Sequence, residues 1–297
     1  MRRYNVVELQ GGLGNQLFQV AFAESLVTKL ERQIVLDSSW YSRERVGRNL
    51  YQLPLDSRIS YQTFSQVGGF LHKKITSSLI KPQTFYKGLG FSVVTQKTFS
   101  YENFNISHEP TFFSGTFASP KYWPLGLLPT CKRIKKYLSN YLDREPTKTF
   151  QSNVLSIHVR RGDLITNLKA RNFHGFCTDN YFVQSIDLID SMNIDIKRIQ
   201  IASDDIEAAQ LLAHHLAIRK VPIEIIVDSN PISVMFKLSD SDFFIGSNST
   251  FSWWAAYLEQ KALMIFPDNW FAEPAFDFPK EDLFDGNVHF IQGEVPR

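Results

Sequence analysis

The second half of the chain alternates strand-like and helix-like segments, and this alternation constrains the fold more than any other feature of the sequence. After Pro146, short apolar runs typical of buried strands are separated by stretches in which apolar residues recur at helical spacing. Such alternation requires a mostly parallel sheet with helices on both faces, which is the α/β class. The predicted strands are 154–159, 198–202, 223–227, 243–245 and 263–266, and the predicted helices are 180–192, 204–216, 232–238 and 250–259.

The first forty residues contain the same pattern once more. Residues 4–9 form a β-prone run, a glycine turn follows, and apolar residues at helical spacing lead to a second strand at 34–36. Between residues 38 and 146 the periodicity is weak, and only one helix is predicted there, at 132–143 with Thr130 as its cap. The length of 297 residues suits two domains of about 150 residues each. The predicted domains are residues 1–148 and 149–297.

The composition excludes several classes of function. Lys and Arg total 32 against 30 for Asp and Glu, a formal net charge of +2, whereas nucleic-acid-binding proteins usually carry a basic excess. The two cysteines are too few for a disulfide framework or a cysteine zinc site, and they favour a reducing compartment. The longest uncharged stretch, 243–258, is broken by polar residues and is shorter than the ~20 apolar residues that span a bilayer. The basic N-terminus leads into no apolar run, so we expect no signal peptide.

Two clusters have residue types that bind metals, but neither predicts a metal site. Asp240 and Asp242 have a spacing that can hold a divalent ion, yet Asp242 lies at the mouth of a predicted strand, where solvation of the strand edge is the simpler interpretation. His214 and His215 are consecutive on a helix and therefore lie on adjacent faces, where they cannot chelate one metal well. We expect no metal cofactor.

A glycine-rich loop at residues 11–16 follows the first strand and opens a helix. Backbone N–H groups at such a helix start can bind an anion or approach a sugar closely. A dinucleotide-binding interpretation would use Asp37 as the ribose-binding acid, but Leu17 occupies the place of the third glycine in that motif. A plain structural turn is the other alternative, although Asn15 and Gln16 add polar groups that such a turn does not need.

The strongest chemical signal is the segment 156–163, in which a strand runs into Arg160 and Arg161. In open α/β sheets, ligands bind at the carboxyl ends of the strands. Arginine is permanently charged and pairs with phosphate oxygens, so the two arginines can hold a diphosphate without a metal ion. His158 alternates with the arginines, and Asp163 can orient a guanidinium or accept a proton. The alternative is a structural salt bridge between one arginine and Asp163, with His158 in the core.

Two further strand ends carry polar residues at a helix start. At residues 203–205, one acid is expected to cap the helix, and the other can bind the hydroxyls or the base of a nucleotide. Residues 247–252 form a polar turn and a helix start whose hydroxyl and N–H groups can bind a second phosphate. The tryptophans behind them, Trp253 and Trp254, are expected to pack in the core.

Six segments together resemble glycosyltransferase family 11, the α-1,2-fucosyltransferases, in its bacterial branch. They occur in the family's order and extend over nearly the whole chain. The segments are 11–19, 121–123, 158–163, His174-Gly175 with Tyr181, 203–205 and 248–254.

The resemblance implies two Rossmann-like domains that face each other across a cleft, as in GT-B-like glycosyltransferases. It implies inverting transfer of L-fucose from GDP-β-L-fucose to the 2-hydroxyl of a β-galactoside-type acceptor in surface polysaccharide or oligosaccharide synthesis, without a metal or another cofactor. Arg160 would neutralise the β-phosphate as the glycosidic bond breaks, with His158 and Arg161 in support. The other implied donor-binding residues are Ser203, Asp204, Asp205, Asn248, Ser249, Thr250 and Phe251. The residues implied on the sugar and acceptor side are Gly12, Gly14, Asn15, Gln16 and His174.

The general base is open among Asp163, His174 and Glu8, and we favour Asp163. Two alternatives to the function also stay open: the same fold with another GDP-sugar donor, and a protein that binds a nucleotide-sugar or glycan without turnover. We expect GDP-fucose and a galactose-containing glycan as partners, and no nucleic acid. Because no membrane-spanning segment is predicted, we expect a cytoplasmic protein, with peripheral contact at the inner face of the bacterial plasma membrane as a further option.

Overall fold

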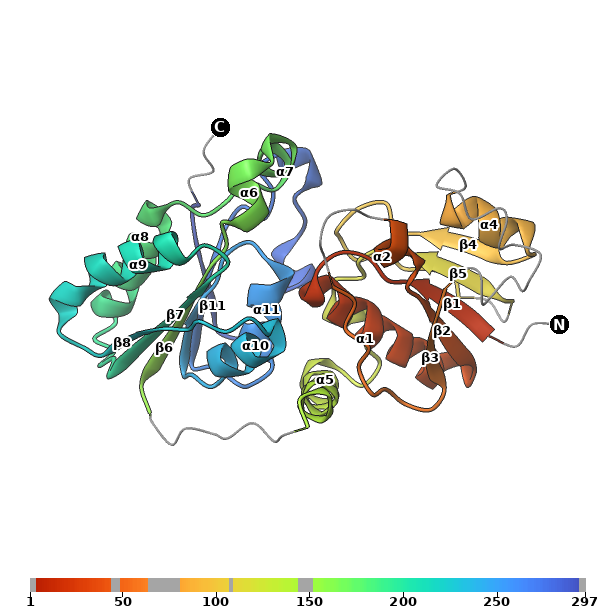
Figure 1. Ribbon diagram of the computed structural model, residues 1–297, viewed down its shortest axis with the longest axis horizontal. Helices are drawn as coiled ribbons and strands as arrows, with labels where there is room; N and C mark the ends of the chain where they lie inside the picture. Colours follow the sequence, from red (N-terminus) through yellow and green to blue (C-terminus); the bar gives the residue numbers. More distant parts are fainter. Residues whose placement is uncertain (1–3, 44–48, 64–80, 107–108, 144–151, 294–297) are drawn as a thin grey trace. The chain divides into compact units, whose positions relative to one another are not determined.

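The computed structural model describes residues 4–43, 49–63, 81–106, 109–143 and 152–293, and Figure 1 draws it as a ribbon. The chain divides into two compact units, Met1–Tyr141 and Leu142–Arg297, and each unit has its own parallel sheet. The α/β class predicted from the alternating pattern is therefore confirmed. The expected domain boundary between residues 148 and 149 lies outside the described residues.

The first unit is built on a five-stranded sheet with the strand order β3-β2-β1-β5-β4, in which all pairs are parallel. Its elements are β1 (Tyr4–Glu8), α1 (Leu13–Leu30), β2 (Gln33–Asp37), α2 (Ser39–Arg43), β3 (Ile59–Gln62), α4 (Pro82–Gly88), β4 (Ser92–Thr95), β5 (Thr111–Ser114), the 3-10 helix η2 (Pro120–Tyr122) and α5 (Leu127–Tyr141).

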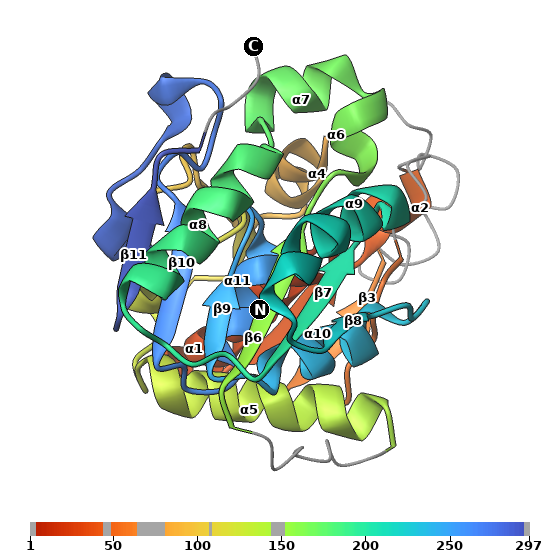
Figure 2. The same cartoon turned by 90° about the vertical axis from the view of Figure 1, so that its left-hand side faces the viewer.

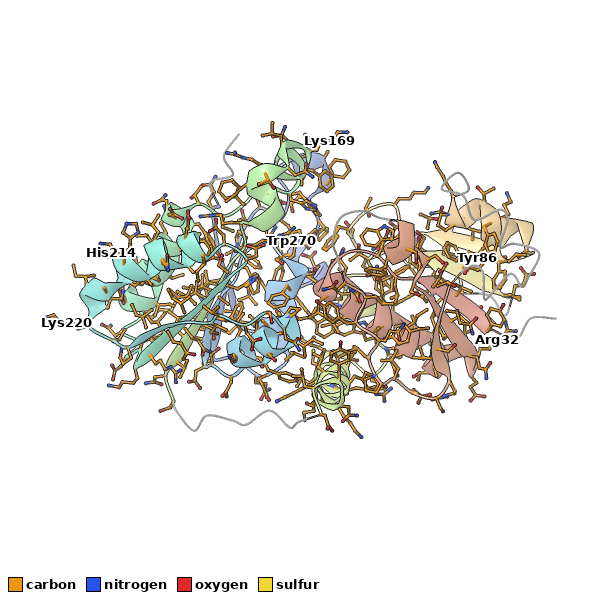
Figure 3. The ribbon with its side chains drawn as sticks, in the orientation of Figure 1. Arg32, Tyr86, Lys169, His214, Lys220 and Trp270 are labelled. Atoms are coloured by element: carbon orange, nitrogen blue, oxygen red, sulfur yellow. The ribbon has the colours of Figure 1, made fainter. Side chains whose placement is uncertain are left out.

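Strand β5 explains how both faces of this sheet are filled. Side chains alternate across a strand, so Phe112 and Phe113 point to opposite faces. Phe112 stacks on Tyr86 of α4 with 4.3 Å between ring centroids, and Phe113 meets Phe22 of α1 edge to face at 5.4 Å. Figure 3 labels Tyr86. The strand is buried on both faces, which is why its two central residues are both apolar and do not alternate with polar ones.

The second unit is built on a six-stranded parallel sheet with the order β11-β10-β9-β6-β7-β8. Helices α8 and α9 cover one face, and α10 and α11 cover the other (Figures 1 and 2). The elements are β6 (Val154–Val159), α6 (Gly162–Thr166), α7 (Leu168–His174), α8 (Asp179–Ser191), β7 (Arg198–Ser203), α9 (Ile206–Leu216), η3 (Ala217–Arg219), β8 (Ile223–Ile225), α10 (Pro231–Ser239), β9 (Phe243–Ile245), α11 (Thr250–Tyr257), β10 (Leu263–Pro267), η4 (Pro274–Phe276), η5 (Lys280–Asp282) and β11 (Val288–Ile291).

The order of the strands creates a switch point beside β6. From β6 the chain adds β7 and β8 on one side and then returns to add β9, β10 and β11 on the other. Connections that leave β6 and β9 therefore diverge to opposite faces of the sheet. In open α/β sheets, ligands bind outside the carboxyl ends of the strands at such a point.

Two parts of the fold differ from the sequence predictions. Helix α5 begins at Leu127 rather than at residue 132, because the Thr130 hydroxyl donates to the Gly126 carbonyl at 2.8 Å and Thr130 lies within the helix instead of capping it. The sequence did not predict helices α2, α4, α6 and α7 or strands β3, β4, β5 and β11. Among the residues that the structure describes, no helix is long and apolar enough to cross a membrane.

Candidate functional site

Three strands of the second sheet end side by side and bring the predicted donor-binding segments together. The register pairs Val159 of β6 with Ser203 of β7, and Ile157 of β6 with Ile245 of β9. The parallel strands all end at one side of the sheet, which we call the carboxyl edge. The segments that begin at Arg160, at Ser203 and at Gly246 consequently meet at this edge, next to the switch point.

Ser247 fixes the backbone on which Arg160 stands. Its hydroxyl donates to the carbonyl of His158 at 2.8 Å and accepts the N–H of Arg160 at 3.0 Å. These two bonds continue the contact between β6 and β9 beyond the end of the sheet pairing. Arg160 itself is half-buried. The sheet and Ser247 therefore fix the Cα position of Arg160, and its side chain extends from a backbone that is held in place.

Arg161 has a different environment from its neighbour. Its buried guanidinium donates to the carbonyl of Cys177 and to the carboxylate of Asp179, the latter at 2.6 Å. It also lies 4.6 Å from the centroid of the Phe176 ring, a cation–π contact. Arg161 thus holds the loop before α8 against the carboxyl edge. Asp179 is its ion-pair partner among the described side chains. Asp163, the partner considered from the sequence, lies in α6, and its side chain is outside the described residues.

The two acids after β7 have separate structural roles. Asp205 caps α9, because its carboxylate accepts the N–H groups of Glu207 at 3.0 Å and Ala208 at 3.2 Å. Asp204 is exposed, and its carboxylate accepts the N–H of Arg161 at 2.7 Å. Gly162 has a positive φ of 26°, and a Cβ built there would lie 2.2 Å from an oxygen of Asp204. Only glycine lets this turn approach the carboxylate so closely.

His158 is a neutral group in this site. Burial, together with the charge of Arg160, lowers its pKa from 6.5 to about 3. Its Nδ1 lies 2.6 Å from the hydroxyl oxygen of Ser252, which also accepts the N–H of Ser247 at 3.2 Å. The imidazole packs against the ring of Phe251 at 4.9 Å. A neutral His158 can donate or accept a hydrogen bond to a ligand, but it adds no charge near neutral pH.

The loop before α11 combines a helix cap with an anchoring amide. The Ser249 hydroxyl accepts the N–H of Phe251 at 3.2 Å, so Ser249 is the cap, and Thr250 is the first helical residue. The buried side chain of Asn248 donates to the carbonyls of His174 at 2.7 Å and Trp270 at 3.0 Å. Asn248 is therefore an anchor between three segments, and His174, predicted on the sugar side, lies beside the donor-binding set within one unit.

The glycine loop belongs to the first unit, where it follows β1. Gly11 has φ of 83°, and a Cβ there would lie 2.5 Å from the side chain of Asn15. Gly12 caps α1 without a side-chain bond, and Gly14 lies in the first turn. The side-chain amide of Gln16 donates through Nε2 to the carbonyl of Asn49 at 2.9 Å. Its Oε1 accepts the N–H of Tyr51 at 3.0 Å.

Glu8, one of the three candidate bases, is buried at the end of β1 and accepts a hydrogen bond from Ser114 at 2.7 Å.

Metal-ligating residue types do not gather at the described carboxyl edge. No group of three or more His, Cys, Asp or Glu side chains suited to a metal occurs among the described residues. Asp242 accepts the N–H of Val154 at 3.1 Å and so supports the start of β6. His214, labelled in Figure 3 with Trp270, lies at the far end of the unit from that tryptophan.

Sequence reasoning missed the contacts of four residues that organise the site: Ser247, Ser252, Phe176 and Asp179. Ser247 and Ser252 lie in the polar turn and helix start that the sequence singles out, but serine is common at helix starts and nothing in the pattern marks which serine bonds across strands. Asp179 directly precedes the helix predicted at 180–192. Its pairing with Arg161 joins residues 18 positions apart through a loop, so no local spacing reveals it.

Solved structures support the fold assignment. The crystal structure of the NodZ α-1,6-fucosyltransferase co-crystallized with GDP matches with a TM-score of 0.50 and 13% identity, covering 90% of this chain and 96% of that chain. The structure of the fucosyltransferase NodZ from Bradyrhizobium has a TM-score of 0.50 and 10% identity, covering 87% and 94%. At these identities the likeness concerns the fold, which is that of a GT-B-like glycosyltransferase.

Curated relatives align over most of their own length. The alpha-1,2-colitosyltransferase of Escherichia coli is 27% identical over 290 residues, covering 90% of this chain and 92% of the relative. The O-antigen biosynthesis glycosyltransferase WbnK of Escherichia coli is 26% identical over 299 residues, covering 89% and 94%. The model of glycosyl transferase family 11 matches residues 127–291, which is more than half of the chain and includes the whole carboxyl edge. This protein is therefore a glycosyltransferase and belongs to glycosyl transferase family 11.

Proposed function

We propose that this glycosyltransferase transfers L-fucose from GDP-β-L-fucose to the 2-hydroxyl of a β-galactoside-type acceptor, with inversion at the anomeric carbon. The observation that carries the proposal is the position of Arg160: it follows the central strand β6 at the switch point, with its backbone fixed by Ser247 at 3.0 Å. A cation carried on a fixed backbone at that point suits the diphosphate of a GDP-sugar. An acceptor in surface polysaccharide or oligosaccharide synthesis fits the O-antigen relative.

Arg160 would act on the leaving group. As the bond from the fucose anomeric carbon to the β-phosphate oxygen lengthens, its electron pair passes to the phosphate and the sugar gains oxocarbenium character. The acceptor oxygen attacks the opposite face of that carbon and loses its proton. A cation that meets the growing phosphate charge stabilises the transition state more than the ground state. The N–H groups at the start of α11 and the side chains of Ser249 and Thr250 would receive the other phosphate.

His158 and Arg161 would support Arg160 without touching the reacting atoms. His158 is neutral and can hydrogen-bond to the donor, while the buried Arg161 holds the loop at Asp179. We propose Asp163 as the base that receives the acceptor proton, since it directly follows the arginine turn. A pH–rate profile of Asp163→Asn that matches the wild type would remove Asp163 from that role.

A second donor, GDP-colitose, is favoured by one specific observation. The relative named alpha-1,2-colitosyltransferase is 27% identical to this chain. Colitose is fucose without the 3-hydroxyl, so the two donors place the same diphosphate and the same anomeric carbon at the carboxyl edge. They differ at one hydroxyl of the sugar, which a site built to bond it can discriminate strongly.

The deciding experiment incubates the purified chain with GDP-fucose or GDP-colitose and a panel of β-galactosides, with and without EDTA. We expect product and free GDP from GDP-fucose, an α-1,2 linkage in the product, and equal rates with the chelator, because arginine replaces a metal at the diphosphate. Faster turnover with GDP-colitose than with GDP-fucose would identify GDP-colitose as the donor. Tight GDP binding without product from any acceptor would indicate a binding protein, and loss of rate in EDTA would contradict metal independence.

A further inference from the structure

Two phenyl rings stand exposed in the second unit, close to the carboxyl edge. Phe173 in the last turn of α7 is 37% exposed, and Phe276 of η4 is 46% exposed. Their ring centroids are 4.9 Å apart. Behind them, the ring of Phe271 lies 5.2 Å from Phe173 and is 6% exposed. We call these three residues the aromatic platform. The rings of Phe173 and Phe276 face solvent, and the ring of Phe271 is buried beneath them.

The platform is fastened to the donor-binding loop by Asn248. The amide of Asn248 donates to the carbonyl of His174 and to that of Trp270, the residues next to Phe173 and Phe271. A third bond, from the N–H of Ala272 to the carbonyl of Phe173 at 3.1 Å, joins the two segments of the platform to each other. Figure 3 labels Trp270, which locates the region. Since Asn248 directly precedes the cap of α11, the platform is fixed to the loop that we propose holds the donor phosphates.

Packing of the core does not account for the two exposed rings. The buried Phe271 already closes the apolar interior at this point, and Phe173 and Phe276 add a contiguous apolar surface above it. Exposed aromatic surfaces rimmed by polar groups mark binding sites more often than isolated apolar residues do. The half-buried imidazole of His174, 4.8 Å from the ring of Phe173, supplies a polar group at the rim.

We infer that the aromatic platform is a subsite for a pyranose ring of the acceptor glycan, stacked on Phe173 and Phe276. This inference rests on the proposed function for the identity of the acceptor. In a β-galactopyranoside the C–H bonds at carbons 3, 4 and 5 lie on one face of the ring, and this apolar face suits the face or edge of a phenyl group. The hydroxyls point outward to polar side chains such as His174. A galactoside is therefore the acceptor whose chemistry matches the platform.

Direct binding tests the subsite without turnover. Saturation-transfer NMR is recorded for methyl β-galactoside with the full chain in the presence of GDP. We expect saturation at the protons on carbons 3, 4 and 5, and loss of that signal in Phe173→Ala and in Phe276→Ala. Phe276→Trp keeps an aromatic surface and should retain it. The matched control is Leu168→Ala, which removes an apolar side chain that is 68% exposed on the same helix but outside the platform. Absence of galactoside binding to the wild type, or equal binding by all variants, overturns the inference.

Kinetics then separate this subsite from other uses of the rings. With an active donor, each alanine variant should raise KM for the acceptor by about tenfold, which is the scale of one lost aromatic contact. KM for the GDP-sugar and the release of GDP without acceptor should stay unchanged. A raised KM for the GDP-sugar instead would assign the rings to the guanine base. Weaker binding to anionic vesicles with an unchanged acceptor KM would assign them to a membrane. Either result overturns the inference, whereas a wild type inactive with every donor contradicts the proposed function and leaves the NMR test intact.

Discussion

Arg160 and Arg161 are neighbours in sequence but have different roles, because Arg161 is buried and Arg160 is only half-buried. The guanidinium of Arg161 lies inside the protein, where it must be paired, and Asp179, the Cys177 carbonyl and the Phe176 ring supply that pairing. Arg160 is half-buried, with its backbone held by Ser247. Arg161 therefore stabilises the loop, whereas the half-buried Arg160 is the residue that we propose meets the donor phosphate at the strand end.

Replacing the two arginines should consequently affect turnover and thermal stability differently. Arg160→Ala is expected to lower turnover by about 100-fold while the midpoint of thermal unfolding stays near that of the wild type, because it removes a donor to the leaving group. Arg161→Ala should lower the unfolding midpoint as well, since it leaves the Cys177 carbonyl and the Asp179 carboxylate without their cation. Arg219→Ala, in an ion pair with Asp190 on the surface, is the control for losing an arginine. Near-wild-type turnover of Arg160→Ala would contradict its assignment to the leaving group.

The low pKa of His158 makes stability depend on pH. The folded pKa is about 3 against 6.5 for an unperturbed histidine, so between these values the unfolded chain binds a proton that the folded chain does not. Stability at this site is therefore full above about pH 6.5 and is lost as the pH falls toward 3. From pH 7 to pH 5 the loss amounts to about 2 kcal/mol.

The measurement is urea unfolding of the wild type and of His158→Asn at both pH values. The variant lacks the titrating group, so the difference in unfolding free energy between pH 7 and pH 5 should shrink by about 2 kcal/mol. His214→Asn, which changes an exposed histidine, is the control for replacing a histidine by asparagine. An unchanged pH dependence in His158→Asn would mean that His158 is charged in the folded protein.

At the scale of elements, hydrogen bonds between turns hold the site together. Ser247 joins the end of β9 to the end of β6, and Asp204 joins the end of β7 to the same turn through the N–H of Arg161. Gly162 permits the second contact, because any Cβ there would overlap the Asp204 carboxylate. The three strand ends thus form one connected structure, and a change in one turn is transmitted to Arg160.

Asp204 and Asp205 provide a matched pair to test this arrangement. Asp205→Ala removes the cap of α9 and should lower the free energy of unfolding by about 1 kcal/mol, with a modest effect on KM for the GDP-sugar. Asp204→Ala releases the N–H of Arg161 and should raise that KM clearly, because the turn that carries Arg160 loses its anchor. Urea unfolding and steady-state kinetics of both variants distinguish the two roles. Equal effects of the two substitutions on KM would show that Asp205 also binds the donor.

The second unit was largely predictable because most of its strands and helices have a clear local pattern, although α6, α7 and β11 do not. Strand β6 and strand β9 have their predicted bounds, and α11 begins at the predicted Thr250. The first unit was less predictable: in β5 the consecutive Phe112 and Phe113 are buried on opposite faces, and such a pair shows no alternating period. Site residues were found where they follow a strand, but their partners were not, since Asp179 and Ser252 reach the site through tertiary contacts.

At the scale of the whole molecule, each unit has a core of its own. In the first, Val6, Val35, Tyr86, Phe91 and Phe112 pack together; in the second, a larger cluster surrounds β6. Two separate cores predict two unfolding transitions rather than one, each responding only to what binds or changes within its own unit. Because the proposed donor site lies at the carboxyl edge of the second sheet, a ligand for that edge should act on one transition alone.

Calorimetry with GDP tests this division. At a GDP concentration of 100 times its Kd, the second unit gains about 2.7 kcal/mol, and its transition should rise by about 5 to 10 °C. The transition of the first unit should stay in place. Asp205→Ala identifies the second unit, because loss of the α9 cap lowers only its transition, and Phe22→Leu in the core of the first unit identifies the other. Arg160→Ala should reduce the GDP-induced rise, since the ligand then binds more weakly. A rise of both transitions with GDP would mean that both units bind the nucleotide or unfold together, and the donor site would then extend beyond the carboxyl edge.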